Sequence, residues 1–540
     1  MSLRIIGQMT GTSMDGIDVA ILEIKDQFDF RSSHHYFLPF PNEMKELLSA
    51  CRVAVNKNQQ LNQPPSLEEG KINFEQSIFN YLTNELKLTE VEKNNKLNHY
   101  KKYLRNNRNT IDPITMDEVI KIYVELNVKA IRLLIKKAKL TEEDIDVIAS
   151  HGQTVGHSPK NCVTIQLNDG QLTANLTGIF TIVDFRHRDV SLGGHGAPFA
   201  PLFHQALVTR YVVQLPIVQE YLNSRPGVSK VDAILASRIH LSYAVINMGG
   251  ISNGSFINGV TDKDIKGFDT GLGNYATNQL VELFTQGKEK MDKNAKYGLK
   301  GKINEDYINK LHKIFKSYLD KKPPKSLDTQ INLNPLIEVV KPLAEISLHN
   351  ACATLEAFAA KNIVDQLKHV NYFPENWILA GGGWNNPVIV MELLRELRKK
   401  QNLPEKISRE ELIKQLTDKI ETKELFKLIK LESGEEIITD DIDGVKLLTY
   451  LKEKIDPQKE QVLINNADEL PGWSNSAMEA LIFAYLGYRT LNKMPTSLTE
   501  TTGVSKSVPG GYGYKPENQW SNKKIEILLE ENPELLTGYQ

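Results

Sequence analysis

Residues 7–18 read Gly7-Gln8-Met9-Thr10-Gly11-Thr12-Ser13-Met14-Asp15-Gly16-Ile17-Asp18, a turn rich in glycine and hydroxyl groups. Mostly apolar segments flank this turn at 3–9 and 17–24. We expect a strand, a tight turn and a second strand, because turn residues between two apolar runs are typical of a β-hairpin. A similar pattern returns at 243–257, where the turn reads Met248-Gly249-Gly250-Ile251-Ser252-Asn253-Gly254.

Glycine-rich turns often bind phosphate, because backbone N–H groups can converge on an anion where no Cβ intervenes. The Walker loop and the dinucleotide fingerprint both require a helix after the glycines, whereas a strand is expected after each of these turns. The turn at Gly11 also lacks the Walker lysine, and either turn taken alone fits an ordinary hairpin. A third cluster, at 381–383, lies between an expected strand at 377–380 and an expected helix at 388–399. The three clusters together are less easily explained as ordinary turns than any one of them alone.

This arrangement resembles the actin-like superfamily, which includes acetate and sugar kinases, Hsp70 and actin. In finer detail the chain resembles the anhydro-N-acetylmuramic acid kinase family, whose pattern the fungal levoglucosan kinases share. After residues 7–18, the matching blocks are Ser150-His151-Gly152-Gln153-Thr154, Asp184-Phe185-Arg186 with Asp189, Gly193-Gly194 with Gly196-Ala197-Pro198, Gly267-Phe268-Asp269-Thr270-Gly271 with Gly273-Asn274, Pro323-Pro324-Lys325-Ser326, Gly381-Gly382-Gly383 with Asn385, and Glu479-Ala480 with Phe483-Ala484.

The resemblance implies an α/β protein of two lobes with the actin-like sugar-kinase fold, each lobe built on a mixed sheet, around a central nucleotide cleft. We place the N-terminal lobe at 1–240, with a charged insertion at about 51–109. The C-terminal lobe is placed at 241–505, with a second charged insertion at about 401–459, and a tail at 506–540 packs on the surface. Both insertions are rich in Lys, Asn, Gln and Glu, so we expect them to be solvated and weakly packed.

The implied activity is ATP-dependent phosphorylation of a 1,6-anhydro sugar at O6, coupled to hydrolytic opening of the 1,6-bridge. The implied ATP and phosphate contacts are Gly11, Thr12, Ser13, Asp15, Gly16, Asp18, Asn247, Gly249, Gly250, Asn253, Asp269, Gly271, Gly273, Asn274, Gly381, Gly382, Gly383 and Asn385. The implied sugar contacts are His151, Gly152, Gln153, Thr154, Gly194, Gly196, Ala197 and Pro198. Mg²⁺ is the expected cofactor beside ATP, because it prefers oxygen ligands, and Asp269 would hold it through waters. The side chains of Asp15, Asp18 and Asp269 could equally cap turns.

Asp189, Arg186 and Glu479 are the candidate catalytic residues. Asp189 would act as the base that deprotonates water, and Arg186, three residues earlier, would favour its ionised form. The alternative is a structural Arg–Asp pair at the end of a strand. Glu479 opens an otherwise apolar helix, either as an acid favoured by the helix dipole or as a group aimed into the cleft.

At three places the sequence departs from the family pattern, and these departures bear on which sugar is bound more than on which reaction is catalysed. His195 stands where glutamine is usual, Asn278 where aspartate is usual, and Leu327-Asp328-Thr329 where Thr-Gly-Arg is usual. The first expectation for the substrate is anhydro-N-acetylmuramic acid, and levoglucosan is the alternative. An actin- or Hsp70-like ATPase and a catalytically weak scaffold protein are further alternatives.

Composition bounds the remaining possibilities. The 540 residues carry 65 Lys+Arg against 67 Asp+Glu, so there is no overall basic field to attract nucleic acid. We expect no membrane partner, because no apolar run reaches the roughly 18 residues that span a bilayer. Three widely spaced cysteines favour neither a zinc ribbon nor a disulfide framework, and they fit a reducing, cytoplasmic compartment. The resemblance implies a homodimer.

Overall fold

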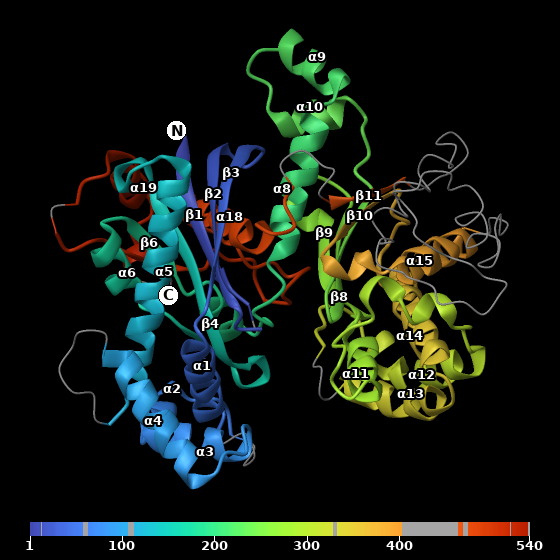
Figure 1. The fold of residues 1–540 in the computed structure, drawn as a ribbon. Coiled ribbons are helices and arrows are strands. Elements are labelled where there is room, and N and C mark those ends of the chain that lie inside the picture. Colours follow the sequence, from blue (N-terminus) through green and yellow to red (C-terminus); the bar gives the residue numbers. More distant parts are fainter. Residues whose placement is uncertain are drawn as a thin grey trace. The chain divides into compact units, whose positions relative to one another are not determined.

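The computed structural model describes residues 1–11, 13–57, 63–105, 113–327, 332–401, 463–467, 473–518 and 520–537. Contacts divide the chain into two compact units: unit 1 is Met1–Ser237 with Gly472–Gln540, and unit 2 is Arg238–Pro471. Figure 1 shows the elements of both units. Thr12, Asp328, Thr329 and almost all of the expected insertion at 401–459 lie outside the described residues.

Unit 1 is built on a sheet with the strand order β12-β6-β4-β1-β2-β3, and β5 pairs with β4 at its side. The first three strands are antiparallel, whereas β4 runs parallel to β1 and β6 runs parallel to β4. The strand bounds are β1 Leu3–Thr10, β2 Gly16–Asp26, β3 Asp29–Pro39, β4 Val147–Ser158, β5 Val163–Leu167, β6 Phe180–Val183 and β12 Tyr512–Tyr514. The expected first hairpin is confirmed, with Gly7 opposite Ala20. The apolar run before Ser150 predicts a strand at 145–150, and β4 extends beyond it to Ser158, so residues 151–154 lie within this strand.

Helices cover the faces of this sheet, and several belong to the expected first insertion. The helices of unit 1 are α1 Asn42–Val55, α2 Leu67–Lys71, α3 Phe74–Asn84, α4 Glu90–Arg105, α5 Met116–Ala138, α6 Gly170–Thr177, α7 His187–Ser191, α8 Ala200–Val213, α9 Pro216–Ser224, α10 Lys230–Ala236, α18 Met478–Leu491, α19 Lys523–Glu531 and α20 Glu534–Thr537. Leu82, Tyr100 and Leu104 are buried in one hydrophobic core with α1 and α5. The expectation of a weakly packed first insertion is therefore wrong for its described helices, because one apolar face of each packs into this core.

Helix α18 packs in unit 1, although we had placed residues 472–505 in the C-terminal lobe. A Cβ at Gly7 of β1 would lie 1.8 Å from the carbonyl oxygen of Ala480 in α18. A Cβ at Gly487 would lie 2.8 Å from Cβ of Ala149 in β4. Two glycines on facing surfaces thus let the helix backbone approach the sheet closely.

The C-terminal segment contributes to the core of unit 1 rather than only covering its surface. Strand β12 pairs antiparallel with β6, with Gly513 opposite Ile182. Leu535 of α20 is fully buried, and the side-chain amide of Asn532 donates to the carbonyl oxygen of Thr490 at 2.9 Å. The tail is therefore an integral edge of the sheet.

Unit 2 repeats the strand order of unit 1. Its sheet has the order β11-β10-β7-β8-β9, in which β7, β8 and β9 are antiparallel and β10 runs parallel to β7. The strands are β7 Tyr243–Met248, β8 Ile251–Ile257, β9 Ile265–Leu272, β10 Asn376–Ala380 and β11 Leu463–Asn466. The helices are α11 Tyr275–Phe284, α12 Glu305–Leu319, α13 Asn334–Ile346, α14 Leu348–Asp365 and α15 Pro387–Lys400. The α/β class is confirmed, and the expected second hairpin is present as β7–β8. Among the described helices, none is long and apolar enough to cross a membrane.

Candidate active site

Asp189 lies in the short helix α7, and both oxygens of its fully buried carboxylate accept hydrogen bonds. The backbone N–H of Gly196 donates to Oδ1 at 2.5 Å, and the hydroxyl of Thr502 donates to Oδ2. A Cβ at Gly194 would lie 2.2 Å from Oδ1, so this position leaves room for the carboxylate. Two predicted sugar-contact glycines, Gly194 and Gly196, therefore surround Asp189.

The contact between Arg186 and Asp189 is indirect. Both side chains are hydrogen-bonded to the backbone of Gly196, and the structure describes no ion pair between these two residues. Its Nε donates to Nε2 of His151 at 2.7 Å, and Nη1 donates to the carbonyl oxygen of Gly196. The guanidinium also lies over the ring of Phe199, 5.2 Å from its centroid. Burial lowers the pKa of Arg186 to about 10, opposed by the charges of Asp189 and Glu479, so the side chain stays cationic at neutral pH. The alternative of a structural pair between Arg186 and Asp189 would need a direct contact of their side chains, which these two described residues do not make.

His151 is buried and neutral. Burial lowers the pKa of its imidazole well below the usual value, and the charge of Arg186 adds to this effect. Because Nε2 accepts from Arg186, the neutral ring carries its proton on Nδ1. The ring packs against Phe483 of α18, with the centroids 4.6 Å apart.

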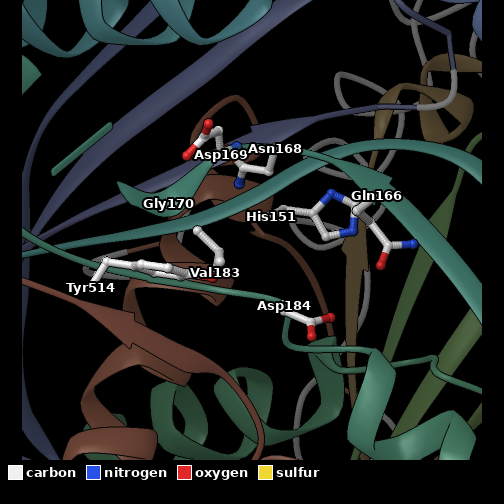
Figure 2. A pocket seen from close by; sticks show the side chains of 8 residues that line it. All are labelled: His151, Gln166, Asn168, Asp169, Gly170, Val183, Asp184 and Tyr514. Atoms are coloured by element: carbon white, nitrogen blue, oxygen red, sulfur yellow. The ribbon is translucent and has the colours of Figure 1, made fainter. Parts of the chain in front are cut away.

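A pocket with a volume of about 350 Å³ opens beside His151 of β4, near the ends of β5 and β6. Figure 2 shows the side chains that line it: His151, Gln166, Asn168, Asp169, Gly170, Val183, Asp184 and Tyr514. Asp184 belongs to a motif block quoted above, but Gln166, Asn168, Asp169 and Tyr514 were missed. Tyr514 comes from the C-terminal strand β12, and a Cβ at Gly170 would lie 2.4 Å from its ring.

The remaining residues of the 151–154 block support the first glycine turn. The amide of Gln153 donates to the carbonyl oxygen of Gly11 at 3.2 Å, and the hydroxyl of Thr154 accepts from Gln166 at 3.3 Å. Gly152 has a φ of +83°, a conformation that favours glycine. The predicted sugar contacts Gln153 and Gly152 thus shape the backbone around the turn. The structure describes Ala197 and Pro198 in the segment that leads from Gly196 into α8.

A polar network beneath this turn was not anticipated. The side-chain amide of Gln8 donates to Thr10 at 2.9 Å and to Asn127 of α5 at 3.1 Å, and its carbonyl oxygen accepts from Ser150 at 2.5 Å. Gln8 is fully buried. The sequence did contain a signal for this network, namely a glutamine inside an otherwise apolar strand. Buried polar side chains are nearly always hydrogen-bonded, so such a residue predicts polar partners.

Three carboxylates gather near the first turn. Asp15 accepts from the Ser13 hydroxyl at 2.8 Å, and Asp18 pairs with His35 at 2.7 Å. Desolvation by the surrounding protein raises the pKa of Glu479, and the negative charges of Asp18 and Asp15 add to this shift, whereas Arg186 opposes it. Glu479 itself is solvent-exposed at the start of α18, so its two possible roles, a helix-start acid and a group aimed into the cleft, stay predictions.

In unit 2 the predicted glycine segments converge. The N–H of Asn274 donates to the carbonyl oxygen of Gly249 at 2.9 Å, and that of Gly273 donates to Gly250 at 3.0 Å. A Cβ at Gly381 would lie only 2.6 Å from Oδ1 of Asn247. The φ of Gly381 is +91°, which also favours glycine at this position. By contrast, no heavy atom beyond the chain neighbours lies within 4 Å of a Cβ placed at Gly249 or Gly382. These two glycines present exposed backbone, as phosphate or nucleotide binding requires.

Asp269 and the nearby Pro-Pro-Lys-Ser block are connected. The backbone N–H of Leu327 donates to Oδ2 of Asp269 at 2.8 Å, and the N–H of Asp269 donates to the carbonyl oxygen of Lys325 at 3.2 Å. Burial raises the pKa of Asp269 to about 6, so its carboxylate is ionised at neutral pH. An ionised carboxylate suits a role in holding Mg²⁺ through waters. Across the described residues, no group of three or more His, Cys, Asp or Glu side chains is placed to bind a metal ion directly.

A buried carboxyl group supports the third glycine cluster. Glu356 of α14 is fully buried, and its Oε1 accepts from the side-chain amide of Asn386 at 2.7 Å. Asn386 caps α15 by accepting from the N–H of Ile389 at 3.1 Å, and its own N–H donates to the carbonyl oxygen of Gly383 at 3.2 Å. Asn385, which we had predicted as a nucleotide contact, lies between Gly383 and this cap. Sequence reasoning missed both Glu356 and Asn386.

The sequence matches the profile of the anhydro-N-acetylmuramic acid kinase family over residues 3–92, 101–218 and 223–407. The chain belongs to this family. An anhydro-N-acetylmuramic acid kinase of Methylobacterium nodulans is 26% identical over 515 residues, which cover 95% of this chain and 100% of the relative. The enzyme of the same name from Vibrio vulnificus strain CMCP6 is 26% identical, with 94% and 97% of the two chains covered.

Membership of the anhydro-N-acetylmuramic acid kinase family confirms the expected class, a carbohydrate kinase. The match covers most of unit 1 and the part of unit 2 that carries the glycine clusters. Among solved structures, an ROK family glucokinase from Streptomyces griseus is 10% identical with a TM-score of 0.24, over 73% of this chain and 89% of that chain.

Proposed function

We propose that this protein is an ATP-dependent kinase that opens the bridge of a 1,6-anhydro sugar and phosphorylates the released O6. The observation that carries this proposal is the buried carboxylate of Asp189, held on both oxygens and flanked by Gly194 and Gly196. Anhydro-N-acetylmuramic acid, the sugar in the names of the relatives, is the first substrate to test, and levoglucosan is the alternative.

The chemistry explains why a base is needed. The bridging oxygen of a 1,6-anhydro sugar is an ether and carries no proton, so the base must act on water. In our proposal the Asp189 carboxylate takes a proton from water while the water oxygen bonds to C1. The bond between C1 and O6 then breaks, and O6 takes the γ-phosphoryl group as ADP leaves.

Asp189 has the capacity for this step. Each carboxylate oxygen has two lone pairs, so a single donor on each oxygen leaves a second acceptor position for water. The hydrogen bonds to both oxygens hold the carboxylate in place, and the guanidinium of Arg186 is bonded to the carbonyl oxygen of the same Gly196. The neutral imidazole of His151 adds no second positive charge, and we propose that the pocket beside it takes part of the sugar.

We further propose that the glycine turns at 11–16 and 249–250 and the cluster at 381–383 bind ATP through backbone N–H groups. Phosphoryl transfer depends mainly on positioning and on neutralising the charge of the phosphates. Mg²⁺ would supply part of that neutralisation, and Asp269 would hold it through waters. Asn247, Asn253, Gly271, Gly273 and Asn274 would complete this binding region.

The test is an assay of ADP release with each sugar in turn. We expect turnover that requires the sugar, and with H₂¹⁸O the label should enter at C1 of the product and not the phosphoryl group. A prompt readout is needed because the anomeric hydroxyl exchanges with solvent. Equal ATP hydrolysis with and without sugar would contradict the proposal and favour an actin- or Hsp70-like ATPase, whereas no turnover at all would favour a scaffold protein.

We also propose a cytoplasmic homodimer. Cys51, Cys162 and Cys352 are all free thiols, which suits a reducing compartment. Light scattering should give twice the chain mass of 61.0 kDa at micromolar concentration. Particles of 61.0 kDa alone would contradict the dimer.

A further inference from the structure

Thr502 contacts Asp189 from a distant part of the sequence. It follows α18 in the chain, 313 residues after Asp189, and its hydroxyl donates to Oδ2 of the carboxylate. The side chain is fully buried. No expected site residue included it, because the family blocks that we used for the site end at α18.

The backbone around Thr502 fixes the position of its hydroxyl. The N–H of Thr502 donates to the carbonyl oxygen of Leu498 at 3.0 Å, and its carbonyl oxygen accepts from the N–H of His195 at 2.7 Å. His195 immediately precedes Gly196, whose N–H donates to Oδ1 of Asp189. The segment around Thr502 and the loop around Gly196 are therefore hydrogen-bonded to each other and to opposite oxygens of one carboxylate.

Two donors on opposite oxygens restrict rotation of the carboxylate about its Cβ–Cγ bond. A base must present a lone pair to the water proton in a defined direction, so this restriction contributes to catalysis. The carbonyl oxygen of Leu498, 3.2 Å from the Thr502 hydroxyl, is the competing acceptor.

We infer that Thr502 is a positioning residue that orients the Asp189 carboxylate for proton abstraction. This inference rests on the proposed role of Asp189 as the base. Thr502 acts through Asp189 and is not itself assigned a contact with the sugar or the nucleotide.

The experiment compares Thr502→Val, which keeps the shape and removes the donor, with Thr502→Ser, which keeps the donor. We expect Thr502→Val to lower kcat by about 10- to 100-fold, the range for losing a hydrogen bond to a charged group. The KM values for sugar and ATP should change by less than about threefold, because Thr502 is assigned no contact with either ligand. Thr502→Ser should restore kcat.

Thr501→Val is the matched control. Thr501 is the neighbouring threonine, equally buried, and its hydroxyl donates only weakly to Leu498 at 3.5 Å. This variant should show the kcat of the wild type. If Thr502→Val does not fold, Thr502→Ala serves with the same readouts, and melting temperatures identify folded variants.

Normal kcat in folded Thr502→Val would overturn the inference, as would a Thr502→Ser variant as slow as Thr502→Val. Asp189→Asn in the same assay distinguishes failure of the role of Thr502 from failure of the role of Asp189. If Asp189→Asn is inactive and Thr502→Val is normal, only the inference about Thr502 fails. If Asp189→Asn turns over normally, the proposed mechanism fails and the role of Thr502 falls with it.

Discussion

Arg186 donates its Nε hydrogen to Nε2 of His151 at 2.7 Å. The same guanidinium donates to the carbonyl oxygen of Gly196, whose N–H donates to Asp189. One cation thus connects the pocket beside His151 with the carboxylate that we propose as the base. Because His151 accepts this bond, its protonation would break it, and burial prevents that protonation near neutral pH.

The first prediction concerns Asp189→Asn. The amide keeps the size of the carboxylate but cannot accept the proton of water, so kcat should fall by about 10²–10⁴-fold. Sugar and ATP should still bind, because the phosphate contacts lie elsewhere. Single-turnover kinetics and titration calorimetry measure the two effects. Near-normal turnover by the folded variant would refute the role of Asp189 as base.

The second prediction separates binding from folding at two glycines of the first hairpin. Gly11→Val should weaken ATP binding, because its side chain would occupy space where the backbone approaches phosphate. The fold should persist, because the atom nearest to a Cβ at Gly11 is the Ser13 hydroxyl oxygen at 3.3 Å. Gly7→Ala should instead destabilise unit 1, typically by about 1–3 kcal/mol, because its Cβ would overlap the Ala480 backbone of α18. Calorimetric titration and thermal melting test the pair. Unchanged ATP affinity in Gly11→Val would remove this turn from the nucleotide site.

The third prediction concerns Glu356→Ala in unit 2. Loss of the carboxyl group leaves the buried amide of Asn386 without this acceptor, which costs about 1–3 kcal/mol. The 381–383 cluster should lose its support, so the KM for ATP should rise several-fold while the KM for sugar stays near normal. Glu392→Ala is the control, since Glu392 is also buried but pairs with Arg395 at 2.9 Å within α15. Parallel rises in both KM values would contradict this assignment.

The fourth prediction is a pH dependence of stability from His204. Burial lowers the pKa of His204 to about 3, and its ring stacks on Trp473 with centroids 5.3 Å apart. Between its unfolded pKa of about 6.5 and pH 3, only the unfolded state binds the proton, so stability falls as the pH falls. This one group should contribute a loss of about 2 kcal/mol between pH 7 and pH 5.

His204→Phe keeps an aromatic ring and removes the titration. Its melting temperature should therefore fall less steeply from pH 7 to pH 5 than that of the wild type. His157, whose pKa burial lowers to about 4, leaves a residual slope in the variant. Identical slopes in the two proteins would show that His204 does not contribute as predicted.

Local sequence signals predicted the elements that depend on local physics. The sequence predicts a helix at about 305–319, because apolar residues recur there at helical spacing, and α12 has these bounds. Asn304 caps its start by accepting from the N–H of Tyr307. The two hairpins and the loop at 381–383 follow equally from glycines between apolar runs. The glycine clusters of the candidate site could be predicted from the sequence for the same reason.

Features that depend on long-range packing were not predicted. Strand β12 spans three residues, which is too short for a periodic pattern, and it forms only because β6 offers an edge. The contact of Thr502 with Asp189 joins segments 313 residues apart, and no local pattern marks it. In α4, by contrast, Leu97, Tyr100 and Leu104 recur on one helix face, so the buried side of this polar helix had a readable signal.

The interrupted chain path of unit 1 has a consequence for synthesis on the ribosome. Every described strand of unit 2 lies between residues 243 and 466, so this unit can assemble while the later residues are still being translated. Unit 1 must wait for α18, for Thr502 and for β12, although its strands β1 to β6 are translated before unit 2. The nascent sheet of unit 1 therefore exposes the unpaired edge of β6 until residues 512–514 have been translated, a period in which chaperones would have a substrate to protect.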